Sequence, residues 1–156
     1  MQSGINEFTH PLQVRWSDID ANRHLRHSVY YDYGALCRMA LFTKVGLSLE
    51  NLQEQKIGPV LLREEAVFRR EIHFEDRILI TAELLKASED YSRWSFRHRL
   101  VKGDDILAAT LTVDGGWIDI EKRKLALPGE SLRQIFSLIP RAPEFEIIEL
   151  TKKTNG

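Results

Sequence analysis

One stretch of the chain combines a short strand, a polar loop and a long helix: VRWSDIDANRHLRHSVYYDYGALCRMALFTKVG, residues 14–46. Apolar and polar residues alternate at its start, whereas its second half has the three-to-four-residue spacing of a helix. Between the two lies a dense run of polar and ionisable side chains: Asp18, Asp20, Asn22, Arg23, His24, Arg26 and His27. We call residues 18–27 the polar loop and expect the chemistry of the protein there.

The long helix is predicted from apolar residues that share one face at helical spacing: Val29, Tyr33, Leu36, Cys37, Ala40 and Leu41. Ser28 is expected to cap its start, and Gly46 to lie just past its end. The polar loop thus leads into a helix N-terminus, where unpaired backbone N–H groups favour a carboxylate, a phosphate or a developing oxyanion. This combination indicates acyl transfer or hydrolysis.

Length and composition indicate a single domain over residues 1–156, with its core at about 12–130 and a C-terminal helix and tail at 129–156. The 22 Lys and Arg nearly balance the 23 Asp and Glu, so no global charge favours nucleic acid. The single cysteine, Cys37, is expected to pack as a small hydrophobe in a reducing compartment. Because no apolar run suits a signal peptide or a membrane span, we expect a cytoplasmic protein that does not bind membranes.

The hydrophobic pattern has a period of two beyond residue 59, as is typical of strands. Gly115 and Gly116 within this region predict a bulge or a close approach of backbone. A short amphipathic helix is predicted at 132–139, and FEIIEL, 145–150, either adds a strand or frays. In all, five strands are predicted: 12–16, 60–74 with a bulge or bend near its middle, 78–87, 93–100 and 106–120.

The order of these elements predicts a two-layer α+β domain. Short turns cannot make parallel crossovers, so the sheet is expected to be antiparallel. The long helix must cover the apolar face of that sheet. The other face or an edge then needs a partner, and we expect a homodimer or a homotetramer.

A string in the polar loop resembles a known family. Asp20-x-Asn22-x-His24-Leu25, with Tyr30 six residues after the histidine, is similar to the hot-dog-fold thioesterases of the 4-hydroxybenzoyl-CoA and plant acyl-ACP branch. The resemblance covers roughly residues 12–130 and implies a five-stranded antiparallel sheet wrapped around one long central helix. Three further segments support it: FRRE at 68–71, GPV at 58–60 and LP at 127–128.

The resemblance also implies roles for individual residues. Asp20 matches the nucleophile or general base, and Asn22 and His24 match its polar companions. A backbone N–H near His27 matches the group that polarises the thioester carbonyl, and Glu71 matches a further acidic residue of the acyl-ACP group. Tyr30 is expected to contact the substrate.

Two departures from the family pattern limit what it implies. Arg26 and His27 stand where the acyl-ACP group tends to have two asparagines. Ile72 stands where that group has a cysteine, so a mechanism that needs this cysteine does not apply. Substrate preference therefore cannot be transferred to this chain.

Each candidate residue also has a structural interpretation. Asp20 could cap backbone N–H groups of its own loop, as aspartates near helix starts often do. Asp18 is expected to be structural. For His24, a structural hydrogen bond and a catalytic role are equally good interpretations. Glu71 could simply be solvated or paired with Arg69.

A metal site in the polar loop is not expected. His24, His27 and Asp20 carry suitable ligand atoms, but their spacing matches no closed zinc pattern. Arg23 and Arg26 would also repel a cation. We therefore predict neither a metal nor another cofactor.

Three arginines on one strand could bind the phosphates of coenzyme A: Arg93, Arg97 and Arg99. Arg93 and Arg97 are kept as candidate substrate-binding residues. An ordinary solvated strand face is the simpler interpretation of all three.

The predicted function is hydrolysis of acyl-CoA or acyl-ACP thioesters in lipid metabolism. A hydratase or dehydratase of enoyl thioesters is an alternative on the same fold. A non-catalytic protein that binds acyl thioesters is another, and the departures at Arg26, His27 and Ile72 keep it open.

Overall fold

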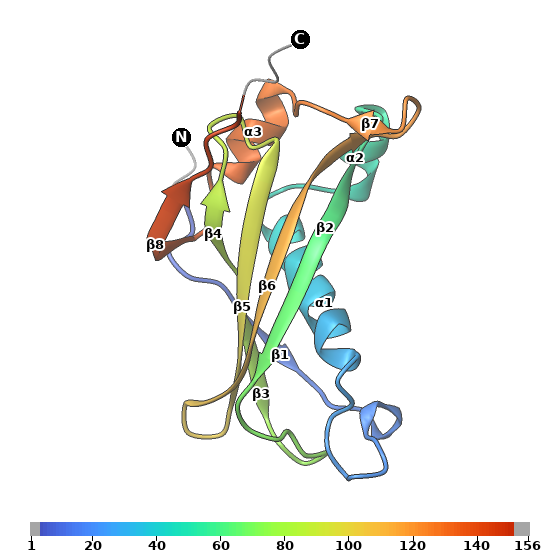
Figure 1. Ribbon diagram of the computed structural model, residues 1–156, viewed down its shortest axis with the longest axis vertical. Helices are drawn as coiled ribbons and strands as arrows, with labels where there is room; N and C mark the ends of the chain where they lie inside the picture. Colours follow the sequence, from blue (N-terminus) through green and yellow to red (C-terminus); the bar gives the residue numbers. More distant parts are fainter. Residues whose placement is uncertain (1–3, 152–156) are drawn as a thin grey trace.

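The computed structural model of the chain describes residues 4–151 (Figure 1). One curved sheet runs the length of the molecule, and a long helix lies against one of its faces. The elements are β1 (Thr9–Leu12), the 3₁₀ helix η1 (Trp16–Asp18), α1 (Val29–Lys44), α2 (Leu49–Glu54), β2 (Ile57–Phe68), β3 (Ile78–Thr81), β4 (Glu83–Ala87), β5 (Arg93–Lys102), β6 (Ile106–Asp119), β7 (Lys124–Leu125), α3 (Glu130–Phe136) and β8 (Arg141–Ile147).

The sheet is built around β5. Strand β6 pairs with one side of β5, while β3 and β4 pair with successive parts of its other side. Strand β2 lies outside β6, β1 outside β3, and β8 outside β4. All of these pairs are antiparallel except β4 with β8, which the long intervening chain makes possible.

The α+β hot-dog architecture expected from the sequence is confirmed, with more strands than predicted. Within the described residues the sheet has eight strands instead of five. The strand predicted at 78–87 is divided at Ala82 into β3 and β4, and the segment 141–147, which includes part of FEIIEL, forms β8. The two-residue β7 is too short to leave a periodic signal.

Two predicted strand boundaries were wrong. Strand β1 ends at Leu12, and Trp16, expected to face the core, is 76% exposed at the start of η1. The cause is Asp18, whose carboxylate accepts the backbone N–H and the guanidinium of Arg15 and so closes a turn. Strand β2 has the expected bulge between Leu61 and Arg63, but it ends at Phe68, well before residue 74.

Helix α1 presents most of its predicted stripe to the sheet. Cys37 and Leu41 are fully buried, and burial raises the pKa of the Cys37 thiol to about 12, so it stays protonated. Leu36 was placed on the buried face wrongly, because it is half exposed. Gly46 follows the helix at φ 91°, a conformation that glycine adopts without strain. Among the described helices, none is long and apolar enough to cross a membrane.

Gly115 leaves room for a close approach from the two neighbouring strands, as the paired glycines predicted. A Cβ at Gly115 would lie 2.3 Å from Cη2 of the buried Trp94 and 2.7 Å from the carbonyl oxygen of Val60. We therefore expect Gly115→Ala to lower the free energy of unfolding by about 1 to 3 kcal/mol, measured by urea denaturation. Gly58→Ala is the matched control, because its Cβ would meet only ordinary contacts, 3.8 to 3.9 Å away. Equal stability of the two variants would contradict this packing.

Candidate active site

The polar loop is closed by hydrogen bonds that converge on Asp20. The Asp20 N–H donates to the carbonyl of His24 at 2.9 Å, and Arg23 adopts a positive φ of 65° to complete the turn. Asp20 Oδ1 accepts the backbone N–H groups of Asn22 at 2.9 Å and His24 at 3.3 Å. Among the described residues, Oδ2 accepts no hydrogen bond. One oxygen of Asp20 therefore holds the loop, and the other remains free for a ligand.

Asp18 is structural, as expected. It is buried, and its carboxylate accepts hydrogen bonds from Arg15 and from the Tyr33 hydroxyl at 3.0 Å. Burial alone would raise its pKa, but the bonds from Arg15 and Tyr33 outweigh that effect and lower it. Asp18 therefore ties the start of the polar loop to α1.

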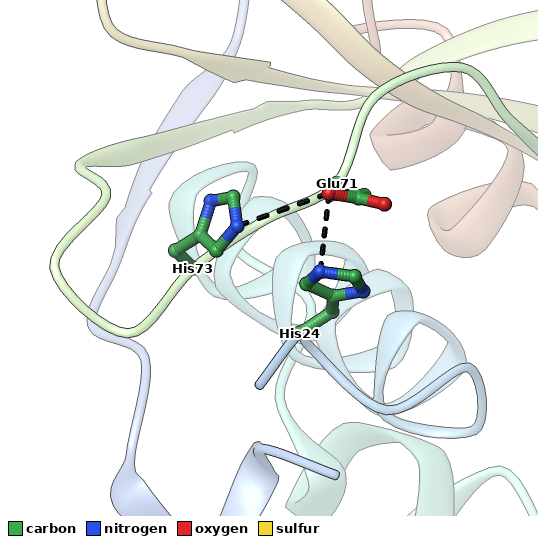
Figure 2. Close-up of side chains that lie close together, drawn as sticks. All are labelled: His24, Glu71 and His73. Atoms are coloured by element: carbon green, nitrogen blue, oxygen red, sulfur yellow. Dashed lines mark ion pairs between the residues drawn. The ribbon is translucent and has the colours of Figure 1, made fainter. Parts of the chain in front are cut away.

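A second segment, between β2 and β3, completes the site. The Leu25 N–H donates to the Ile72 carbonyl at 2.7 Å, which fixes this segment against the polar loop. The Ile72 side chain is fully buried, while Glu71 and His73 on either side of it are exposed. Figure 2 shows the result: His24 Nε2 lies 3.1 Å from Glu71 Oε2, and His73 approaches the same carboxylate.

The position of Glu71 changes its interpretation. The sequence left it solvated or paired with Arg69, but the structure pairs it with His24. If His24 Nε2–H donates to Glu71, the other ring nitrogen, Nδ1, is left as an acceptor. The buried Ile72 side chain is part of the hydrophobic core. An apolar residue therefore suits this position, where the acyl-ACP group has a cysteine.

The two segments line an open cavity of about 340 Å³ next to the start of α1. Tyr30 and Phe68 pack edge to face in its wall, with ring centroids 4.9 Å apart. Burial, followed by the charges of Asp20 and Glu71, raises the pKa of Tyr30 to about 12, so its hydroxyl remains a donor. The lining residues are Asp20, His24, Leu25, His27, Tyr30, Phe68, Arg69, Arg70 and Glu71.

Next to the start of α1, His27 lines this cavity and can offer it a backbone donor. Within the described residues, the N–H groups of His27 and Ser28 donate to no protein acceptor. Ser28 occupies the N-cap position, but its hydroxyl accepts Arg26 Nε and makes no capping bond. Arg26 also donates to the Ser17 carbonyl, so its role is to brace the polar loop.

Three sequence candidates lie away from the cavity. The Asn22 side chain is exposed and not part of the lining, and its backbone N–H is what contacts Asp20. Arg93 lines a different cavity beside β5 and β8. Arg97 is held by Glu83 and Glu144, so its charge is already paired within the sheet. The structure thus gives neither arginine a contact with the site around Asp20.

Comparison with known proteins places the chain in a family. The family model described as the thioesterase-like superfamily matches residues 14–136. The chain belongs to the thioesterase-like superfamily. This membership confirms the family predicted from the Asp-x-Asn-x-His string and, with it, the reaction class, hydrolysis of acyl thioesters. No curated protein sequence matches the chain.

Solved structures show that the chain has the fold of this superfamily. A hypothetical protein of Staphylococcus aureus in complex with CoA is 23% identical, with a TM-score of 0.78 over 88% of this chain and 85% of that one. A 1,4-dihydroxy-2-naphthoyl-CoA thioesterase from Synechocystis is 17% identical, with a TM-score of 0.74 over 85% and 96%. The DHNA-CoA thioesterase of Staphylococcus aureus is 15% identical, with a TM-score of 0.78 over 85% and 90%.

Sequence reasoning gave no role to His73, and it placed neither Arg69 nor Arg70 at the substrate site. Glu71 and His73 are two residues apart, so in the strand expected at 60–74 they would share one face, although β2 in fact ends at Phe68. The contact with His24 could not be read from that pattern, since it depends on the long-range bond between Leu25 and Ile72.

Proposed function

We propose that this thioesterase hydrolyses acyl-CoA thioesters in the cavity between Asp20, Glu71 and the start of α1. The observation that carries the proposal is the convergence of a free carboxylate oxygen, a histidine–glutamate pair and the unpaired backbone N–H of His27 on one cavity. Each of these is a group that thioester hydrolysis needs.

The mechanism assigns one task to each group. Asp20 Oδ2 takes a proton from a water molecule as its oxygen attacks the thioester carbonyl carbon. The N–H groups of His27 and Ser28 stabilise the oxyanion that forms. The C–S bond then breaks, the proton passes to the departing sulfur, and the acid and the free thiol leave. His24, oriented by Glu71, positions the attacking water.

Direct attack by Asp20 on the carbonyl is the alternative within the same site. It would form an anhydride that water then hydrolyses. Asn22 supports either route through its backbone bond to Asp20, which fixes the direction of the carboxylate.

CoA is the proposed carrier for two reasons. A structural neighbour was solved in complex with CoA, and other neighbours are named as CoA thioesterases. Arg69 and Arg70 also give the cavity a basic border that suits the phosphates of CoA. An acyl carrier protein shares the phosphopantetheine arm and would present its thioester to the same groups.

The proposed location is the cytoplasm. The buried, protonated Cys37 suits its reducing conditions.

The test is release of free thiol from short, medium, long and aromatic acyl-CoAs, with acyl-carrier-protein thioesters as a second panel. Release from the acyl-CoA panel supports the proposal, and release from carrier-protein thioesters alone overturns the choice of carrier. A hydratase would consume an enoyl thioester without releasing thiol, and a binding protein would leave all substrates intact. Either result overturns hydrolysis.

We also propose a homodimer formed along β2, with a homotetramer as two such pairs. Within the described residues, β2 pairs only with β6, which leaves twelve residues of strand edge without a partner. Four large apolar side chains of this strand are exposed: Leu61, Leu62, Val67 and Phe68. Because β2 ends beside the cavity, a partner strand would lie next to the site.

The dimer predicts a specific effect of charge on this edge. Wild-type protein should elute as a dimer in size-exclusion chromatography with light scattering, whereas Val67→Lys should shift it to monomer. Leu79→Lys on β3 is the control, since Leu79 is similarly exposed but lies off β2, and it should remain dimeric. A monomeric wild type, or a dimeric Val67→Lys variant, would refute β2 as the interface.

A further inference from the structure

A third side chain completes a triangle at the edge of the active site. His73 Nε2 lies 3.9 Å from Glu71 Oε2, the oxygen that is 3.1 Å from His24 Nε2. The two imidazole rings meet edge to face, with centroids 5.2 Å apart. One ligand atom from each of the three residues lies within 4.8 Å of the others. In Figure 2 both histidines direct a ring nitrogen at the carboxylate.

Two imidazoles and one carboxylate are a zinc-binding set. Zn²⁺ takes histidine nitrogen and carboxylate oxygen at about 2.0 to 2.2 Å, so tetrahedral ligand atoms are separated by about 3.3 Å. The distances from Glu71 Oε2 to His24 Nε2, 3.1 Å, and to His73 Nε2, 3.9 Å, lie on either side of that value. The side chains of Glu71 and His73 are more than half exposed, so small rotations can bring the three atoms together around an ion.

The surroundings hold His73 in place for such a role. Its backbone N–H donates to Asp76 Oδ2 at 2.7 Å, and its ring Nδ1 lies 3.6 Å from the same oxygen. A carboxylate that accepts a hydrogen bond from a histidine supports a metal-bound imidazole by fixing its tautomer, and a small rotation of the exposed His73 ring would bring Nδ1 within hydrogen-bond distance of Asp76. Of the nearby cations, Lys102 is paired with Asp76, whereas Arg69 and Arg70 line the cavity beside Glu71 and would oppose the binding of a cation.

The prediction that the protein binds no metal was argued from other residues. It weighed Asp20 and His27 together with His24, and the repulsion of Arg23 and Arg26. The structure instead joins His24 to Glu71 and His73, which come from a segment nearly fifty residues away in sequence.

We propose that His24, Glu71 and His73 form a binding site for Zn²⁺ or a similar divalent transition metal, and that the bound ion inhibits the enzyme. A metal on His24 and Glu71 would remove their lone pairs from the reaction. Metal binding stands on the geometry alone, whereas inhibition rests on the proposed function.

The experiment measures binding and activity separately on untagged protein. Co²⁺ titration followed by visible absorption should show a tetrahedral centre, and competition with a chelator should give the Zn²⁺ affinity. His73→Gln should weaken Zn²⁺ binding by at least about 100-fold, since a ligand is lost. It should keep its thiol-release activity and lose sensitivity to Zn²⁺. His10→Gln, on β1, is the control and should behave like wild type.

Two outcomes would overturn the metal site: no Co²⁺ or Zn²⁺ binding by wild type, or equal affinity in wild type and His73→Gln. If the metal binds but activity is unaffected by Zn²⁺, the inhibitory role is overturned. If no thioester is hydrolysed, the proposed function fails, and the absorption measurement still decides the metal site.

Discussion

Replacing Asp20 by asparagine should lower kcat for thioester hydrolysis by about 10²- to 10⁴-fold, with little change in KM. The asparagine keeps Oδ1 as an acceptor for the N–H groups of Asn22 and His24, so the polar loop should stay closed. What the variant loses is the carboxylate that takes a proton from water. Thiol release under saturating substrate measures the effect.

The control for this prediction is Asp32→Asn. Asp32 is an exposed carboxylate in the first turn of α1, so its substitution makes the same change of charge near the helix start without touching the cavity. It should retain activity within about threefold of wild type. If Asp20→Asn were equally active, while unfolding at the same urea concentration, Asp20 would only cap its loop.

The sequence predicted those parts of the fold that depend on local pattern. Helix α1 and strands β2, β5 and β6 have strong periods of three to four or of two, and all four were found. The break at Ala82 has no local signal, because β3 and β4 separate where each meets a different neighbour across the sheet. Trp16 was misplaced because the carboxylate of Asp18 closes a local turn with Arg15, and this turn outweighs strand alternation.

For the site too, the sequence predicted local relations between residues but not long-range contacts. Asp20 and His24 stand in one short string, so their closeness follows from sequence spacing alone. The pairing of His24 with Glu71 does not, because it depends on the hydrogen bond from Leu25 to Ile72. A resemblance to a family could suggest Glu71 as a candidate, but only the structure gives its partner.

A buried polar pair between α1 and the sheet was missed altogether. His98 lies on β5 between Phe96 and Leu100, the positions that period two turns toward the helix, and it is fully buried. Its Nε2 lies 3.0 Å from a guanidinium nitrogen of Arg38, and its Nδ1 lies 2.9 Å from the Thr81 carbonyl. The arginine must donate, so Nε2 accepts and Nδ1–H donates to Thr81. This arrangement requires a neutral ring.

The neutral His98 should make the protein sensitive to mild acid. Burial, followed by the charge of Arg38, lowers the pKa of His98 from 6.5 to about 3, although the bond to Thr81 opposes the shift. Between these values the unfolded chain binds a proton that the folded protein does not, so stability is present above pH 6.5 and is lost as the pH falls. Over this range, one such group lowers the free energy of unfolding by about 1.4 kcal/mol for each unit that the pH falls. The loss is about 3 kcal/mol between pH 6.5 and 4.5.

Urea denaturation at several pH values between 7 and 4.5 measures this slope. His98→Gln should be less stable at pH 7, because its amide oxygen can still accept from Arg38 but the donor to Thr81 is lost. Its stability should nevertheless depend much less on pH across the same interval. His10→Gln should keep the wild-type slope, and Asp18, whose lowered pKa acts below 3.8, should not contribute above pH 4.5.

A slope that survives in His98→Gln would mean that another group carries the acid sensitivity. If that variant does not fold, NMR titration of the His98 ring in wild type gives the same answer. A ring that stays neutral down to pH 4.5 supports the buried pair, and one that titrates near 6.5 contradicts it. Arg38 opposes protonation of His98, because a second cation would then lie between α1 and the sheet, and among the described residues Arg38 has an ion pair only with Glu64.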